Sequence, residues 1–146
     1  MHRTFAVALA LLVASLPALA ADSQRIAQVK TVSGTAAVQR GGARLPLKIG
    51  DPLYQSDVIV TGSDGTVGLT FIDNTVFSAG PDSELALTEF HFDSSNFRGD
   101  MLADMRKGTL TVVSGDIARS SPGKMKIETP TAILGVRGTT FAIKIE

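Results

Sequence analysis

One arginine near the C-terminus stands between two glycines. Arg137 lies between Gly135 and Gly138 in the stretch TPTAILGVRGTTFAI, residues 129–143. A guanidinium offers five N–H donors in a rigid fork, which suits a carboxylate or several backbone carbonyls at once. The glycines permit a positive φ or a close approach of another backbone. Arg137 therefore predicts a clasp inside the fold, with Asp57 as the expected partner, or else a binding site for an acidic partner.

The residues around Arg137 predict a corner in the chain. Thr129 precedes Pro130, which favours an extended backbone at the threonine. Residues 131–134 are short and apolar, as in a buried strand. Val136 and Arg137 would fit poorly at the centre of a two-residue hairpin turn, so a bend or bulge between stacked strands is expected.

Groups suited to catalysis are few. Beyond the first twenty residues the chain has one histidine, His91, and it has no cysteine at all. His91 alternates with Phe90 and Phe92, which predicts the exposed face of a strand. The carboxylates of Asp82 and Glu84 could serve acid–base chemistry on sugars, but their turn-like surroundings favour solvated residues. The sequence thus predicts a protein without catalytic residues, metal or cofactor.

Acidic residues also recur in turns. Asp51, Asp64 and Asp73 each stand beside glycine, proline or asparagine. None of these turns has the D-x-D-x-D-G spacing of a calcium loop. We therefore expect their carboxylates to cap the turns through hydrogen bonds to nearby backbone N–H groups.

The N-terminus has the pattern of a cleavable signal peptide. An apolar stretch, residues 5–16, follows Arg3, and Pro17 and the small residues of Ala18–Ala20 come next. This order predicts a signal peptide over residues 1–20 with cleavage after Ala20. An uncleaved anchor is the alternative, but the stretch is short for a membrane span and proline interrupts it. We expect a periplasmic or secreted domain, residues 21–146, without a membrane span, and the lack of cysteine excludes a lipoprotein.

The charge balance argues against some partners. The chain has 14 basic and 14 acidic residues, and loss of Arg3 leaves the mature chain one unit negative. Such a balance is not that of a nucleic-acid or anionic-membrane binder. Several basic residues lie in the C-terminal third of the chain, but no aromatic residues are interleaved with them, so nucleic-acid binding is not expected. These basic residues are Arg106, Lys107, Arg119, Lys124 and Lys126.

Short alternating runs between turn signals predict an all-β fold. Residues 66–72, 124–128 and 141–146 alternate apolar and polar side chains with a period of two. Residues 100–106 are the one helix candidate, and a strand fits them comparably. We expect a single domain of many short antiparallel or solenoid-like strands. The pattern leaves open a twisted β-solenoid or a β-sandwich, because both need the same alternation.

Five motifs in order resemble the FecR domain family of exported bacterial proteins. The chain carries VQR and LKIGD, then SDVIVTG, VGLTFID, GPDSEL and finally ETP with GVRGT, from Val38 onward. One position departs from the family, because Asn74 stands where the family usually has glycine. The family-motif residues, for which a structural role is expected, are Gly50, Asp51, Asp57, Thr61, Gly62, Thr129, Pro130, Gly135, Arg137, Gly138 and Thr139.

The resemblance implies a curled array of short strands in the bacterial periplasm. Its best-known members are membrane-spanning regulators of sigma factors that sense an outer-membrane iron–siderophore transporter. The apolar stretch of this chain looks like a cleavable leader and not like the membrane anchor of those regulators, so we expect a stand-alone exported domain.

The resemblance favours a non-catalytic protein-interaction or sensing module with a protein partner in the cell envelope. A free edge is expected at the C-terminal strand, residues 139–145, where Lys144 guards against self-pairing. One alternative is a module that binds peptidoglycan or another envelope carbohydrate, or has a structural role. A small secreted hydrolase ranks lower.

Overall fold

Strands make up most of residues 24–146, the part of the chain that the computed structural model describes. The predicted signal peptide, residues 1–20, and its cleavage after Ala20 lie outside the described residues. The strands are β1 (Arg25–Ser33), β2 (Ala36–Arg40), β3 (Ala43–Pro46), β4 (Pro52–Tyr54), β5 (Val58–Thr61), β6 (Thr66–Phe71), β7 (Val76–Ala79), β8 (Glu84–Asp93), β9 (Arg98–Val113), β10 (Met125–Glu128), β11 (Ile133–Val136) and β12 (Thr140–Ile145), with one short helix, α1 (Asp116–Ser120). The all-β prediction is confirmed.

Apolar and polar residues alternate along the strands, and in the structure the apolar ones are buried and the polar ones are exposed. In β6, Val67, Leu69 and Phe71 are each at most 3% exposed. In β10, Met125 and Ile127 are fully buried and the lysines between and before them are exposed. Successive side chains of a strand point to opposite faces, so one face of each strand supplies the core.

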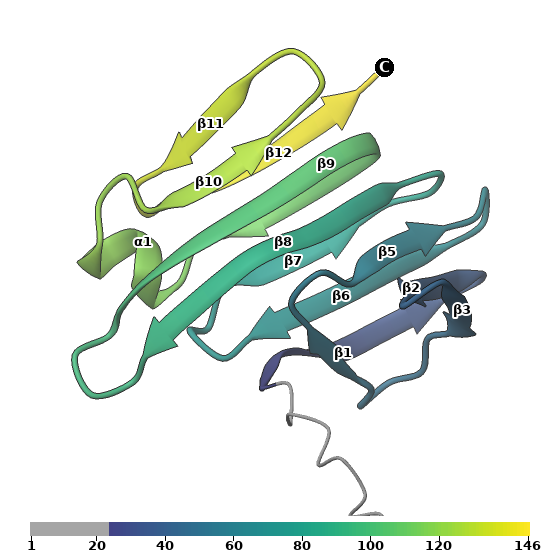
Figure 1. The fold of residues 1–146 in the computed structure, drawn as a ribbon. Helices are drawn as coiled ribbons and strands as arrows, with labels where there is room; N and C mark the ends of the chain where they lie inside the picture. The colour runs from purple at the N-terminus through teal and green to yellow at the C-terminus, as the bar shows by residue number, and fades with distance from the viewer. Residues whose placement is uncertain (1–23) are drawn as a thin grey trace, which may run out of the picture.

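All the strands belong to one hydrogen-bonded sheet, which is curled so that its two halves face each other (Figure 1). The first, called the β1 half, has the order β4–β1–β6–β7–β9–β12, and the second, the β2 half, has the order β3–β2–β5–β8–β9–β10–β11. Neighbours are antiparallel except β9 and β10, which are parallel. The halves share β9.

The long strand β9 passes from one half to the other at Gly108. Before Gly108 it pairs with β8 and β10, and from Gly108 onward it pairs with β7 and β12. Gly108 has a φ of +89°, which favours glycine, and a Cβ there would collide with Ser83. Residues 100–106 lie within β9, so the strand alternative for this segment is the correct one.

The core lies between the two halves. Phe71 in the β1 half stacks on Phe90 in the β2 half with ring centroids 5.4 Å apart, and meets the edge of Phe77 at 4.8 Å. A single cluster of buried apolar residues includes members of both halves. The arrangement therefore has the facing layers of the sandwich alternative, although the layers are parts of one continuous sheet.

A buried aspartate ties α1 to the turn between β6 and β7. Asp73 is fully buried, and its carboxylate accepts hydrogen bonds from the Thr75 N–H (3.1 Å), the Thr75 hydroxyl (2.8 Å) and the Ile117 N–H (3.2 Å). Asn74 has a φ of +68° and its amide donates to Asp116 of α1 at 3.1 Å. Asn74 therefore takes the left-handed position where glycine is usual and adds a bond to the helix. The expected turn cap at Asp73 thus extends to α1, which the sequence analysis did not predict.

We expect Asp73→Ala to lower the free energy of unfolding by about 2–4 kcal/mol, because buried N–H groups of Thr75 and Ile117 lose their acceptor. The matched control is Asp93→Ala at the exposed end of β8, where the free energy of unfolding should change much less because the carboxylate is in solvent. Urea denaturation of both variants measures the difference. Equal losses in the two variants would contradict the role assigned to Asp73.

Candidate functional site

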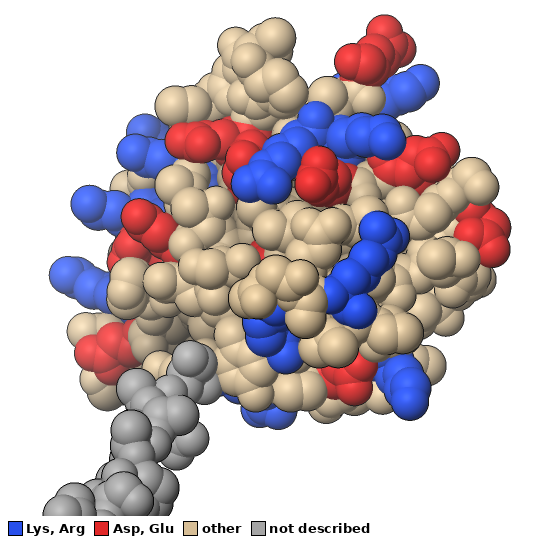
Figure 2. All heavy atoms as spheres, turned by 45° about the vertical axis from the view of Figure 1, so that its right-hand side comes forward, with Lys and Arg blue, Asp and Glu red and all other residues tan. Residues whose placement is uncertain are grey.

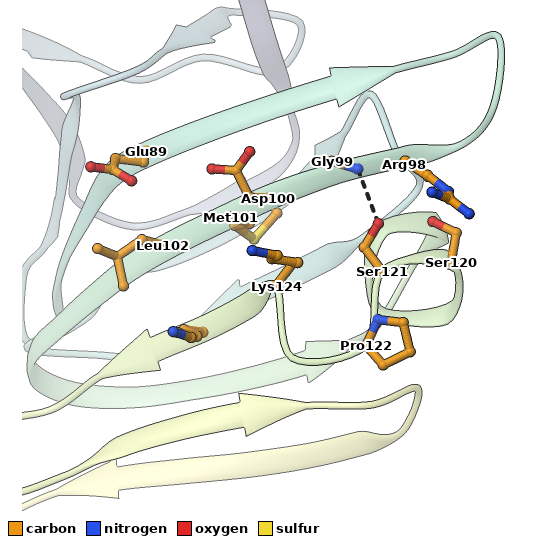
Figure 3. Close-up of a pocket in the computed structure, with 11 residues that line it drawn as sticks. Glu89, Arg98, Gly99, Asp100, Met101, Leu102, Ser120, Ser121, Pro122 and Lys124 are labelled. Atoms are coloured by element: carbon orange, nitrogen blue, oxygen red, sulfur yellow. Dashed lines mark hydrogen bonds between the residues drawn. The ribbon is translucent and has the colours of Figure 1, made fainter.

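An open groove lies over β8, β9 and β10 on the outer face of the β2 half (Figure 3). Its volume is about 850 Å³. Glu89 of β8, Asp100 and Leu102 of β9, and Lys124 and Lys126 at β10 lie along it. The groove ends against the end of α1 and the segment after it, where Ser120, Ser121 and Pro122 line it together with Arg98 and Gly99.

The strand register explains how the groove is lined. Leu102 is paired with Glu89 on one side and with Lys126 on the other. Asp100 is paired with His91, and extension of the β9–β10 register places Lys124 on its other side. Paired residues of neighbouring strands share a face, so acidic side chains lie toward β8 and lysines lie over β10.

The basic side chains of the groove are not neutralised by the fold. Asp100 of β9 faces its register partner His91 of β8, with Oδ2 and Nδ1 3.3 Å apart. Within residues 24–146, no carboxylate oxygen lies within 4 Å of the charged nitrogens of Arg98, Lys124 or Lys126. The groove therefore offers basic groups to a ligand.

The closed end of the groove is held by side-chain hydrogen bonds. The Gly99 N–H donates to the Ser121 hydroxyl at 3.2 Å, and the Ser120 hydroxyl donates to the carbonyls of Asp116 and Phe97. Phe97 is 55% exposed with a φ of +58°, which is uncommon for a bulky residue. These bonds join the β8–β9 turn to α1 and fix the end wall.

Within residues 24–146 the sheet has four edge strands, two at each end, and they differ in whether they contain proline. At one end, β3 contains Pro46 and β4 contains Pro52. At the other end, β11 pairs with β10 alone and β12 pairs with β9 alone among the described residues, and neither contains proline. Proline removes a backbone donor and protects an edge from pairing. The predicted edge at the C-terminal strand is present, and β11 provides a second one.

Asp57 is clasped by Arg40, so the predicted partnership of Asp57 with Arg137 is wrong. Arg40 donates from Nε to Oδ1 at 2.8 Å and from Nη2 to Oδ2 at 2.7 Å. The Asp57 side chain is 2% exposed and also accepts the Tyr54 N–H at 2.8 Å. Arg40 lies 4.7 Å from the centre of the Tyr54 ring, and its bond to Asp57 raises the pKa of the guanidinium above its ordinary value. The clasp joins β2 to the turn before β5.

Arg137 lies instead on the surface, at the crossing from β11 to β12. It is exposed, and it enters no ion pair within the part of the chain that the structure describes. The expected corner is present, because β11 belongs to the β2 half and β12 to the β1 half. Gly138 makes the turn with a φ of +93°. A positive φ or a close approach of another backbone was expected at Gly135 as well, and neither is present. Its φ is not positive, and a Cβ there would meet nothing within 4 Å.

The remaining motif residues near the C-terminus form turns. Thr129 closes the β10–β11 turn, since its N–H donates to the Ala132 carbonyl at 2.8 Å and its hydroxyl accepts the Ala132 N–H at 3.0 Å. Pro130 lies exposed within that turn. Residues 131–133 are exposed, so the expected buried strand is wrong there. The Thr139 carbonyl accepts the Ser114 N–H at 3.2 Å.

The earlier motif residues occupy crossings between the halves. The Gly50 N–H donates to Val29 at 2.8 Å, and Asp51 accepts the Lys48 N–H at 2.8 Å. The buried Thr61 hydroxyl donates to the Gly80 carbonyl at 2.7 Å and accepts the Ser83 N–H at 2.9 Å. The Gly62 N–H donates to Thr35 at 2.9 Å. These residues are spread over several turns and do not form one site.

The groove offers little for catalysis. No group of three or more His, Asp or Glu residues within 24–146 could hold a metal ion. Glu89 is exposed and Asp100 is half-buried, so neither carboxylate has the dry surroundings that make a general acid. His91 lies on the exposed face of its strand as predicted, with its side chain 67% exposed. Asp82 and Glu84 do not line the groove.

The comparison with protein families matches residues 57–146 to the family described as FecR protein. The chain belongs to the FecR family. Neither a curated protein nor a solved structure matches the chain. The FecR match starts at Asp57, so the motif residues Gly50 and Asp51 lie before it. The Arg40–Asp57 clasp nevertheless joins the earlier strands to the matched part.

The surface charge of this FecR-family chain is mixed. Figure 2 shows basic and acidic side chains interspersed on the face in view, and neither sign covers it alone. No helix of the described part is long and apolar enough to cross a membrane. Lys124 and Lys126 are recognisable as basic residues in the sequence, but the groove is not, because their position opposite Asp100 and Leu102 depends on the parallel pairing of β9 with β10.

Removal of Arg40 and removal of Arg137 should have different effects on the free energy of unfolding. Arg40→Ala should lower the free energy of unfolding by about 2–3 kcal/mol, because it leaves the buried Asp57 carboxylate without its cation. Arg137→Ala should change it by less than about 0.5 kcal/mol, since the side chain is exposed. Chemical denaturation measures both variants. A larger loss in Arg137→Ala than in Arg40→Ala would contradict this assignment.

The two glycines beside Arg137 should also behave differently. Gly138→Ala should destabilise the protein by about 1–2 kcal/mol, because alanine tolerates a positive φ poorly. Gly135→Ala should stay within about 0.5 kcal/mol of the parent, because its Cβ enters open space. Thermal unfolding followed by circular dichroism distinguishes these outcomes, and similar melting temperatures for the two variants would refute the distinction.

Proposed function

We propose that this FecR-family protein is a non-catalytic interaction or sensing module of the periplasm. In this proposal residues 1–20 are a signal peptide cleaved after Ala20, and residues 21–146 are the mature domain. The FecR family is one of regulatory and signalling proteins of the cell envelope, whose members interact with other proteins. A protein partner in the envelope is therefore the expected ligand.

The edges of β11 and β12, which contain no proline, carry this proposal. An unpaired strand presents a row of backbone N–H and C=O groups, and an extended segment of another protein can add to it as a further strand. In β12 the side chains of Phe141, Ile143 and Ile145 are half-buried against the core. An added strand would cover them further, so strand addition would combine hydrogen bonding with apolar burial.

The alternative of carbohydrate binding has less support. Sugar sites usually need exposed aromatic rings on which a sugar can stack. Of the aromatic residues in the described part, Phe97 alone is a largely exposed side chain, and Tyr54 is half-buried beneath Arg40. A small hydrolase would need carboxylates in a cleft that excludes water, whereas the groove with Glu89 and Asp100 is open.

Photocrosslinking in the native periplasm tests the proposal. A photoreactive amino acid replaces Ala142, which is exposed on β12, and the matched control replaces Arg44, which is exposed on the proline-bearing strand β3. We expect one stoichiometric protein partner to be captured from position 142 and not from position 44, as identified by mass spectrometry. Capture of the same proteins from both positions, or of the protein's own copies alone, would overturn the proposal.

A further inference from the structure

We propose that the groove over β8, β9 and β10 binds an extended acidic peptide segment of a partner protein. The inference rests on the proposed function in one respect, which is that the ligand belongs to a protein. The groove and the β12 edge are different surfaces, and binding at the groove is measurable without the native partner. Each proposal can therefore fail alone.

The first argument is the balance of charge along the groove. Arg98, Lys124 and Lys126 line it, and extension of the β10–β11 register places Arg137 opposite Lys124. These four cations come from three strands and their adjoining turns, and none has an ion-pair partner among residues 24–146. A surface that keeps several like charges unpaired on one side is complementary to an anionic ligand.

The acidic residues of the groove lie on its β8 side, and neither is within ion-pair distance of the lysines. Asp100 is engaged with His91 toward β8, at 3.3 Å. Glu89 is paired in register with Leu102, which separates it from Lys126. An acidic ligand that lies over the first part of β10 meets Lys124 and Lys126, with Leu102 as an apolar contact between them and Glu89. Glu128, which follows on the same face of β10, limits the acidic segment to this part of the strand.

The second argument is spacing. Lys124 and Lys126 lie two residues apart with the buried Met125 between them, so their side chains leave the same face of β10. Alternate residues of an extended chain are about 6.6–6.8 Å apart. A peptide that lies extended along β10 with acidic residues at alternate positions repeats at the same interval. Each of its carboxylates can thus meet one lysine.

The third argument is access. Gly135 is paired with Lys126 on the side away from β9, and it has no side chain to cover that lysine. The space above Gly135 is open, since a Cβ there would meet no atom within 4 Å. At the end of the groove, the Ser121 hydroxyl accepts the Gly99 N–H and can donate its own hydrogen to a peptide carbonyl. The groove therefore accepts a chain along β10 without a change in the fold.

Fluorescence anisotropy with labelled synthetic peptides tests the proposal. The probe is a peptide of alternating glutamate and serine, and the matched peptides replace glutamate by lysine or by glutamine. We expect the glutamate peptide to bind, the other two to bind at least about tenfold more weakly, and binding to weaken with added salt. Wild-type protein that fails to bind the glutamate peptide, or binds all three equally, overturns the proposal.

Charge reversal locates the binding. The double variant Lys124→Glu with Lys126→Glu should bind the glutamate peptide at least about tenfold more weakly. The control, Lys30→Glu with Lys48→Glu, reverses two exposed lysines elsewhere and should bind within about twofold of the parent. All four lysines are exposed, so unfolding curves should confirm that both variants fold. Equal losses in both variants would refute the groove as the site. Equally tight, groove-dependent binding of an acidic polysaccharide would overturn the assignment to a peptide.

Discussion

The sharing of β9 between two half-sheets is the constraint on which the rest of this fold depends. Each half needs β9 as a hydrogen-bonded member, so neither half can form its full sheet without the other. The strand can serve both because Gly108 adopts a φ of +89° at the point where the partners change. Ser83 packs against that point, and its hydroxyl accepts the Thr109 N–H at 3.1 Å. The core therefore forms between two layers whose relative position is fixed by covalent continuity as well as by packing.

Polar groups are buried where the chain changes from one half to the other. The Asp57 carboxylate and the Thr61 hydroxyl lie at such crossings, and the Asp73 carboxylate lies in the β6–β7 turn beside α1. Each accepts a backbone N–H group that no strand pairing satisfies. Buried donors without acceptors are costly, so these side chains provide what the sheet cannot. Aspartate and threonine recur in the motifs because a curled sheet leaves backbone N–H groups that need a side-chain acceptor. Arg40 completes the set by neutralising Asp57.

The strands could be predicted from the sequence because burial alternates residue by residue, as in β6 and β10. The Arg40–Asp57 pair could not, because it joins residues 17 positions apart across a strand pairing, and the sequence offered Arg137 as an equally suitable cation. The corner at Gly138 could be predicted because a glycine there permits the positive φ that the turn needs. Gly135 has similar neighbours in the sequence, but it lies in a regular strand with open space beside it. The groove depends on parallel pairing between β9 and β10, a long-range property that residue types alone do not encode. Prediction thus succeeded where the cause is local in the chain and failed where the partner is distant.

The two ends of the sheet differ in their edge strands and in their unpaired charges, and this difference favours the C-terminal end as the place for the proposed partner. At the N-terminal end, β3 and β4 each contain a proline, which hinders pairing at the strand edges, and the Arg40 side chain forms an ion pair with Asp57. At the C-terminal end, β11 and β12 keep free backbone groups, and the nearby cations Lys124, Lys126 and Arg137 remain unpaired among the described residues. Because the β10–β11 hairpin belongs both to a free edge and to the side of the groove, a partner segment that pairs along β11 would bring its flanking residues beside the lysines of β10. Acidic residues next to an edge-pairing segment would then favour one partner and one orientation over others, since backbone pairing alone discriminates poorly between sequences.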